Sequence, residues 1–253
     1  MDQKDRQDEK KEAPDLAEQS RFLRWLDNIW YHYKWFIIVG IFVIVTLAVC
    51  LAQCSKRQTH DLTITYAGGR TLNGIEQEGF SAALGVALPE DFDGNGTKSV
   101  QLVTYGIYTE EELVAMYSQE NSEGVRVVDQ FAYSNAKKQS IDEGSAFSTF
   151  VRTGECAIWF VSAYVYEQYG METLAAPLSD IFGADLPEGA VNDYAVRLGD
   201  TAFYRAYAAV RELPADTLIV LTQPIVYGKV AKDDYYEICR DTYVAIVKFR
   251  GAE

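Results

Sequence analysis

Residues 154–170 read Gly-Glu-Cys-Ala-Ile-Trp-Phe-Val-Ser-Ala-Tyr-Val-Tyr-Glu-Gln-Tyr-Gly, and this stretch decides the fold of the C-terminal part of the chain. Residues 155–161 have the pattern of a strand, and within it the apolar run 157–161 is typical of a strand that is buried on both faces. Ser162 is a favourable N-cap for the helix that follows, and Gly170 ends that helix. The stretch therefore predicts a buried strand that leads directly into a helix.

Strand patterns alternate with helix patterns on both sides of this stretch. The expected strands are 62–67, 99–105, 124–130, 155–161, 194–198 and 217–222. The expected helices are 72–86, 109–116, 140–153, 162–170, 201–211 and 233–249. Strands and helices that alternate at these intervals indicate an α/β domain whose sheet is mixed or mostly parallel and flanked by helices.

An apolar run without charged side chains, residues 35–52, precedes this domain. A helix of this length spans about 27 Å, which is close to the roughly 30 Å of the bilayer hydrocarbon core. Apolar side chains recur at helical spacing just before the run, as in helices that lie in the membrane interface. We expect four segments, which are a disordered cytoplasmic tail, 1–19, an interfacial amphipathic helix, 20–34, a transmembrane helix, 35–54, and an extracytoplasmic α/β domain, 55–253.

The orientation follows from charge and layout. Three basic residues, Arg21, Arg24 and Lys34, precede the run, and two, Lys56 and Arg57, follow it, which slightly favours a cytoplasmic N-terminus. A short charged tail before the span and a large folded domain after it are typical of signal-anchor proteins. The long N-terminal segment of mixed charge does not match a cleaved signal peptide. We therefore expect a single-pass protein of the cell membrane with its C-terminal domain outside.

The net charge of the chain is −14, and nearly all of it lies in the outer domain. Residues 55–253 hold 16 Lys and Arg against 29 Asp and Glu, a net charge of −13. Nucleic-acid binding needs clustered basic side chains, so this composition argues against nucleic acid as a partner. The expected partners are membrane lipid, through the anchor, and a small ligand or an envelope protein.

The domain lacks the residue types that most catalytic sites and metal sites require. The only two histidines, His32 and His60, lie near the apolar run, so a Ser-His-Asp triad or a His-rich zinc site within the domain is not expected. The segment that contains Asp91, Asp93 and Asn95 has the first half of a calcium loop, but Leu102 stands where the bidentate glutamate belongs. A tight turn explains this Asp, Asn and Gly pattern better than a calcium loop does. We predict a non-catalytic protein without metal or cofactor.

The candidate ligand residues follow the expected strands, since ligands of open α/β sheets bind at the carboxyl ends of the strands. They are Gly69, Arg70, Ser162 and Tyr164. The domain has two cysteines, Cys156 and Cys239. An oxidising exterior permits a disulfide between them, and two packed thiols fit the pattern at least as well.

Residues 144–183 resemble extracytoplasmic solute-binding proteins, the capture subunits of ABC importers. The resemblance rests on Gly-Glu-Cys-Ala-Ile-Trp-Phe at 154–160, the helix at 164–170 and Leu-Ala-Ala-Pro-Leu at 174–178. The chain is also similar to uncharacterised bacterial single-pass proteins with Asp-Asn-Ile-Trp-Tyr-His-Tyr-Lys-Trp at 27–35. The resemblance implies a small periplasmic-binding-protein-like fold of type II. Solute-binding proteins usually have Asp where this chain has Ala157, and they have two full lobes.

Two functions compete on these observations. The first is non-catalytic capture of a small molecule or peptide at the carboxyl ends of the strands. The second is a protein-interaction module of an envelope complex, whose crevice is filled by side chains such as Trp159 and replaced by an exposed apolar patch.

Overall fold

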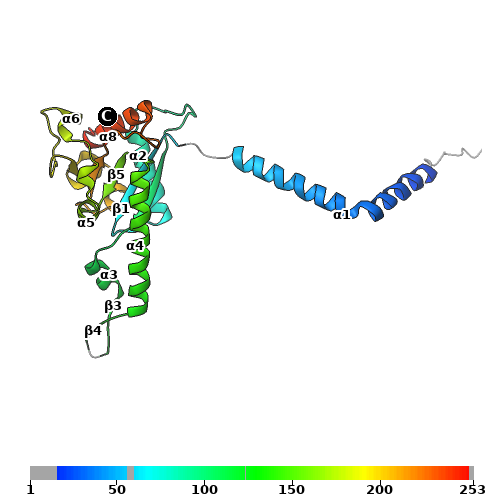
Figure 1. The fold of residues 1–253 in the computed structure, drawn as a ribbon, viewed down its shortest axis with the longest axis horizontal. Helices are drawn as coiled ribbons and strands as arrows, with labels where there is room; N and C mark the ends of the chain where they lie inside the picture. Colours follow the sequence, from blue (N-terminus) through cyan, green and yellow to red (C-terminus); the bar gives the residue numbers. More distant parts are fainter. Residues whose placement is uncertain (1–15, 56–59, 123, 251–253) are drawn as a thin grey trace, which may run out of the picture. The chain divides into compact units, whose positions relative to one another are not determined.

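The computed structural model describes residues 16–55, 60–122 and 124–250, and the chain divides into two compact units, 1–58 and 59–253. In the first unit, α1 (Leu16–Ser55) is one continuous helix, which Figure 1 draws with a bend. It covers both the predicted interfacial segment and the predicted span. The predicted tail lies outside the described residues up to residue 15, and residues 16–19 belong to α1.

The segment Trp30–Leu51 of α1 has a mean hydropathy of 2.6 and no buried part. Among the described residues it is the one helical segment long and apolar enough to cross a membrane. Such a helix near the N-terminus fits a membrane anchor or a signal sequence.

The second unit is built on a five-stranded sheet of order β2-β1-β5-β7-β6. Its strands are β1 (Leu62–Gly68), β2 (Val100–Gly106), β5 (Ile158–Val161), β6 (Ala195–Arg197) and β7 (Leu218–Leu221). β1 pairs in parallel with β2 and β5, whereas β7 runs antiparallel to both β5 and β6. The predicted α/β class with a mostly parallel sheet is confirmed.

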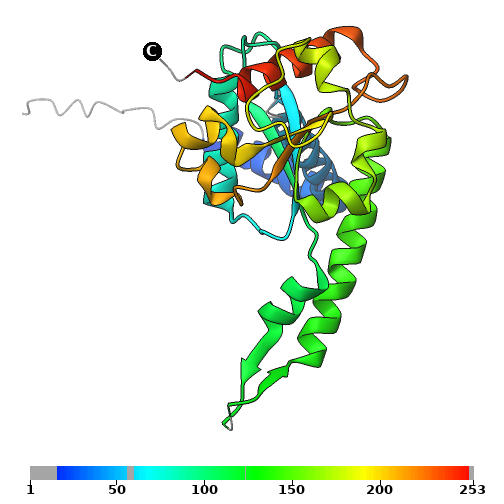
Figure 2. The same cartoon turned by 90° about the vertical axis from the view of Figure 1, so that its left-hand side faces the viewer.

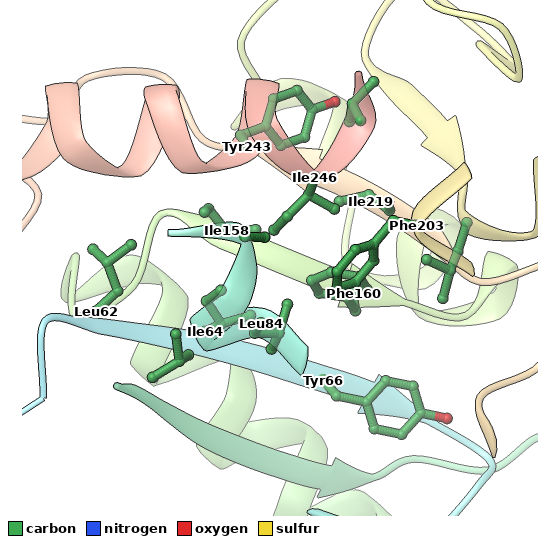
Figure 3. Close-up of a cluster of buried hydrophobic side chains, with 14 of the residues drawn as sticks. Leu62, Ile64, Tyr66, Leu84, Ile158, Phe160, Phe203, Ile219, Tyr243 and Ile246 are labelled. Carbon is green, nitrogen blue, oxygen red and sulfur yellow. The ribbon is translucent and has the colours of Figure 1, made fainter. Parts of the chain in front are cut away.

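Helices cover both faces of this sheet, because successive side chains of each strand point to opposite faces. One face packs against α2 (Gly74–Ala87) and α8 (Asp233–Val247), and Figure 3 shows Ile64, Ile158 and Phe160 of this layer beneath Tyr243 and Ile246. The other face packs against α5 (Ala163–Gln168) and the C-terminal half of α4 (Gln130–Arg152). The two buried layers hold the sheet in the middle of the body.

Between β2 and β5 the chain leaves the body and forms an arm. The arm consists of α3 (Glu110–Tyr117), β3 (Ser118–Glu120), β4 (Arg126–Val128) and the N-terminal half of α4. Figure 2 shows it projecting from the body, with the β3–β4 hairpin at its tip. The hairpin forms a two-stranded sheet of its own. The described residues of the second unit thus form one α/β body with a projecting arm.

Two predicted elements of this region are present, but their bounds differ from the prediction. The strand expected at 124–130 is the short β4 outside the main sheet, and the helix expected at 140–153 begins ten residues earlier. Asp129 caps that helix, since its Oδ1 accepts hydrogen bonds from the N–H groups of Phe131 and Ala132 at 3.1 Å. The first half of α4 lies in the arm, so it lacks the apolar stripe that predicts a helix.

The remaining helices are short. They are α6 (Leu178–Phe182) and α7 (Ala202–Ala206), with 3₁₀ turns at Met171–Thr173, Leu198–Asp200 and Val210–Glu212. The single helix expected at 201–211 is therefore wrong. Its break lies at Tyr207, which has extended backbone angles and packs its ring against Phe203 and Phe249.

Candidate ligand-binding site

The carboxyl ends of β1, β2 and β5 meet at one edge of the sheet, because these three strands are parallel and adjacent. Two of the predicted residues, Gly69 and Arg70, follow β1. The carboxylate of Glu112 on α3 lies against Gly69, where a Cβ would collide with it. Glycine at this position therefore allows α3 to approach the end of β1.

Arg70 is held by two carboxylates of the body. Its Nη2 lies 2.9 Å from Glu76 Oε1 and 3.2 Å from Glu212 Oε2, and its Nε donates to the Glu212 carbonyl oxygen. These bonds fix the guanidinium group at the rim of the sheet edge. Arg70 thereby joins the β1–α2 loop to the 3₁₀ turn Val210–Glu212, which precedes β7.

Ser162 follows β5 and caps α5 as predicted. Its Oγ accepts a hydrogen bond from Val165 N at 3.2 Å, which begins the helix. Tyr164 then lies in the first turn of α5, where its side chain is 39% exposed.

A cavity of about 530 Å³ lies between the arm and the body, and we call it the arm–body cavity. Its walls come from α3, α4, α5 and the loop after β2. The lining residues are Ile107, Tyr108, Glu110, Leu113, Lys137, Ser140, Ile141, Ser145, Ser148, Tyr164, Gln168 and Tyr169. Its volume lies within the range of about 300–1,000 Å³ that is typical of small-molecule sites.

Hydrogen bonds join the walls to one another. Tyr108 N donates to Ser140 Oγ at 3.0 Å, which ties the loop after β2 to α4, and the Tyr108 hydroxyl is bonded to Thr71 Oγ1. Gly144 on α4 lets the Tyr169 hydroxyl lie directly against the helix, since a Cβ would collide with that oxygen. The cavity is therefore preformed on one side by contacts between α4, α5 and the loop after β2.

The charged groups of the cavity are paired. Lys137 Nζ lies 3.2 Å from Glu110 Oε2, and the Tyr133 hydroxyl donates to Glu110 Oε1 at 2.8 Å. Lys137 Nζ also donates to the Tyr133 oxygen at 3.2 Å. The bonds from Tyr133 and Lys137 lower the pKa of Glu110, and the bonds to Tyr133 and Glu110 raise the pKa of Lys137. Both groups are charged at neutral pH and neutralise each other.

Other polar groups of the cavity have no bond within the protein. The side-chain polar atoms of Ser148, Tyr164, Gln168 and Tyr169 have no hydrogen-bond partner among residues 16–55, 60–122 and 124–250. Burial raises the pKa of Tyr169, and the neighbouring Tyr164 adds to the effect. The Tyr169 hydroxyl therefore stays protonated at neutral pH, so it can donate as well as accept.

A second, smaller cavity of about 300 Å³ shares Tyr108 and Leu113 with the first. Arg70 lines it, as does Glu143 of α4, whose carboxylate accepts hydrogen bonds from Gly106 N and from Gln139 Nε2. The structure thus places Tyr164 on one cavity and Arg70 on the other. Ser162 and Gly69 line neither cavity and shape the backbone that surrounds them.

The segment that resembles a calcium loop does bring carboxylates together. Oxygens of Asp61, Asp91 and Asp93 lie within 4.8 Å of one another. Backbone N–H groups already bond to them: Asp61 accepts from Phe92, Asp93 and Ser99, and Asp91 accepts from Gly94 and Gly96. Asp91 and Asp93 therefore lie in the predicted turn, and Asp61 at the amino end of β1 binds the backbone of this loop.

Both cysteines of the domain are free and buried. Cys156 Sγ donates to the carbonyl oxygens of Thr63 and Ile158 at 3.1 Å, and burial raises the pKa of Cys156 to about 11. Trp159, the side chain considered as a filler of the crevice, is fully buried and donates its Nε1–H to the Cys156 carbonyl oxygen at 3.2 Å. These groups belong to the core and line neither cavity.

Sequence reasoning missed Tyr108, Ser148, Gln168 and Tyr169. Tyr164 and Gln168 are spaced by four residues on the helix that Ser162 caps, so the helical period could have identified the second from the first. The contribution of Ser148 could not be found in this way, because it depends on how α4 packs against the body and next to α5.

Comparison with known protein families, with curated proteins and with solved structures finds no match to this chain. The function therefore has to be argued from the site itself.

Proposed function

We propose that the protein is a membrane-anchored capture protein, which binds a small molecule or peptide without catalysis in the arm–body cavity. The observation that carries the proposal is the convergence of four polar side chains without partners, Ser148, Tyr164, Gln168 and Tyr169, on one preformed cavity at the carboxyl ends of parallel strands. Polar groups that meet in a partly apolar hollow are the usual features of a ligand site.

The resemblance to solute-binding proteins supports this proposal. In those proteins the ligand also meets the ends of the sheet strands. We propose that the domain is a small relative of the periplasmic-binding-protein-like fold of type II, in which the arm forms the second wall of the site in place of a second lobe. The apolar helix Trp30–Leu51 supports the membrane anchor, and the charge distribution supports a cytoplasmic N-terminus with the α/β domain outside the cell membrane.

A thermal-shift screen tests the proposal. The full chain in lipid nanodiscs is heated with sugars, amino acids, amines and short peptides, one at a time. We expect at least one class to raise the melting temperature, because binding to the native state alone stabilises it. The same ligand should have a much smaller effect on Tyr164→Ala. No shift with any class would contradict the proposal.

The second candidate function, an interaction module of an envelope complex, is supported by the tip of the arm. Val125, Val127 and Phe131 lie in or next to the hairpin and are 54%, 52% and 80% exposed. Apolar side chains that gather on a projecting element are typical of protein-contact surfaces. Replacement of Phe131 by Asp should then abolish co-purification of a partner from native membranes, whereas replacement of Tyr164 should not.

A further inference from the structure

The charged side chains of the arm–body cavity satisfy each other, which limits the ligands that the cavity can take. Lys137 and Glu110 form an ion pair, and the Tyr133 hydroxyl bonds to both of them. Glu110 and Lys137 are the only charged residues among the described residues that line the cavity, so a ligand carboxylate or ammonium group would find no unpaired opposite charge there. Charged ligands are therefore disfavoured.

The groups that are left for the ligand are uncharged. They are the hydroxyls of Ser148, Tyr164 and Tyr169 and the amide of Gln168. A hydroxyl donates one hydrogen bond and accepts others, and a primary amide does both as well. The best complement to such a set is a ligand that carries several hydroxyl groups of its own.

The rest of the lining favours a ring with apolar faces. Ile107, Leu113 and Ile141 line the cavity together with the tyrosine rings. Sugars combine polar edges, which are rich in hydroxyls, with C–H faces that pack on aromatic and aliphatic side chains. The combination of uncharged hydrogen-bonding groups and apolar surface matches both parts of such a molecule.

The walls of the cavity disfavour an extended peptide. Peptides that bind to α/β proteins as an added strand need the free edge of a sheet, where main-chain groups give the affinity. The residues that line the cavity belong to α3, α4, α5 and the loop after β2, so they offer side chains and not a strand edge. A compact ligand fits these walls better than a chain.

We infer that the ligand of the arm–body cavity is a neutral sugar, a monosaccharide or disaccharide bound through its hydroxyl groups and ring faces. This inference rests on the proposed function, because it specifies the ligand class of the same cavity. It identifies Tyr164 and Gln168 as residues that determine this specificity.

Calorimetric titration of the full chain in phosphatidylcholine nanodiscs tests the inference. Detergents with sugar headgroups must be avoided, since they would occupy the site. The neutral probes are glucose, N-acetylglucosamine, maltose and cellobiose, and the charged probes are glutamate, glycine and putrescine. We expect at least one neutral sugar to bind, with a Kd that changes by less than about twofold between low and high salt, because no ion pair forms.

Variants locate the site. Tyr164→Ala should weaken sugar binding by about tenfold or more, the loss expected for one aromatic contact and its hydrogen bond. Gln168→Ala should weaken it as well. Tyr227→Ala is the matched control, because Tyr227 is 53% exposed and does not line the cavity. It should leave the Kd unchanged.

The possible failures are distinguishable. If only charged probes bind, and Tyr164→Ala abolishes that binding, the cavity is a ligand site and the inference of a sugar is wrong. If a sugar binds equally well to Tyr164→Ala and to the wild type, the inference is also wrong, because the sugar occupies another place. If no probe of either class binds, both the inference and the proposed function fail.

Discussion

Replacement of Asp61 by Ala should destabilise the α/β domain strongly, because one buried carboxylate holds the whole loop that leads into β2. Asp61 is 6% exposed. Its Oδ1 accepts hydrogen bonds from Phe92 N at 2.6 Å and Asp93 N at 3.0 Å, and its Oδ2 accepts from Ser99 N at 2.8 Å. Alanine would deprive three backbone donors of this acceptor.

The size of the effect follows from these three bonds. A donor left unsatisfied in the interior costs about 1–3 kcal/mol. Asp93 is exposed and water can replace its bond, whereas Phe92 and Ser99 are half-buried. We expect a loss of about 2–4 kcal/mol in the free energy of unfolding, which corresponds to roughly 5–15 °C in melting temperature for a domain of this size. Asp61→Asn keeps one acceptor oxygen and should lose about half as much.

Thermal unfolding of the full chain in nanodiscs measures this effect, with Asp216→Ala as the control because Asp216 is exposed. Each variant is heated both with calcium and with a chelator. The structure predicts the same melting temperature in both, since the carboxylates bond to backbone N–H groups. A wild-type melting temperature that calcium raises, with no such rise in Asp61→Ala, would refute this reasoning and show that Asp61 is a metal ligand.

Three further predictions concern single side chains of the body and the arm. Tyr243→Phe should raise the free energy of unfolding by about 1 kcal/mol, because the buried Tyr243 hydroxyl has no hydrogen-bond partner among the described residues. Chemical denaturation measures this change, and a loss of stability would contradict the prediction. The thiols of Cys156 and Cys239 can be counted with Ellman's reagent in a chain whose cysteines at positions 50 and 54 are replaced by serine. No thiol should react in the folded protein at pH 8, since both are buried and burial raises the pKa of Cys156 to about 11, and two should react in denaturant without reductant. If neither thiol reacts in denaturant, the two cysteines form a disulfide. Gly144→Ala should weaken ligand binding, because the new methyl group displaces the Tyr169 hydroxyl into the cavity. The loss of stability should be small, because alanine favours the helix by about 1 kcal/mol over glycine. Unchanged affinity in calorimetry would show that Tyr169 does not contact the ligand.

The strands of the body could be predicted from the sequence because their signal is local. β5 and its helix combine an uninterrupted apolar run with a capping residue, and the structure confirms both. The capping box of Thr109 and Glu112 at the start of α3 is also a local signal. Each of these signals lies within one turn or one strand, so the rest of the fold was not needed to interpret it.

The arm could not be predicted in this way. The first half of α4 has no apolar face, since it projects from the body, and its start depends on the Asp129 cap and on the turn of the hairpin. The arm–body cavity could not be predicted either, because part of its wall comes from the arm. Tyr164 was identified because it follows β5, whereas Ser148 contributes only through the packing of α4 against α5. Long-range packing of this kind leaves no periodic pattern in the sequence.

The central claim, that the arm–body cavity binds the ligand, is tested most directly by fluorine NMR of the chain labelled with 3-fluorotyrosine. The chain has 17 tyrosines, and Tyr→Phe variants assign the signals of Tyr164, Tyr169 and Tyr227. During titration with the ligand, the account predicts that the signals of Tyr164 and Tyr169 shift together and saturate at one Kd, while the signal of Tyr227 stays in place. A ligand that binds without moving the signals of Tyr164 and Tyr169 would contradict the claim.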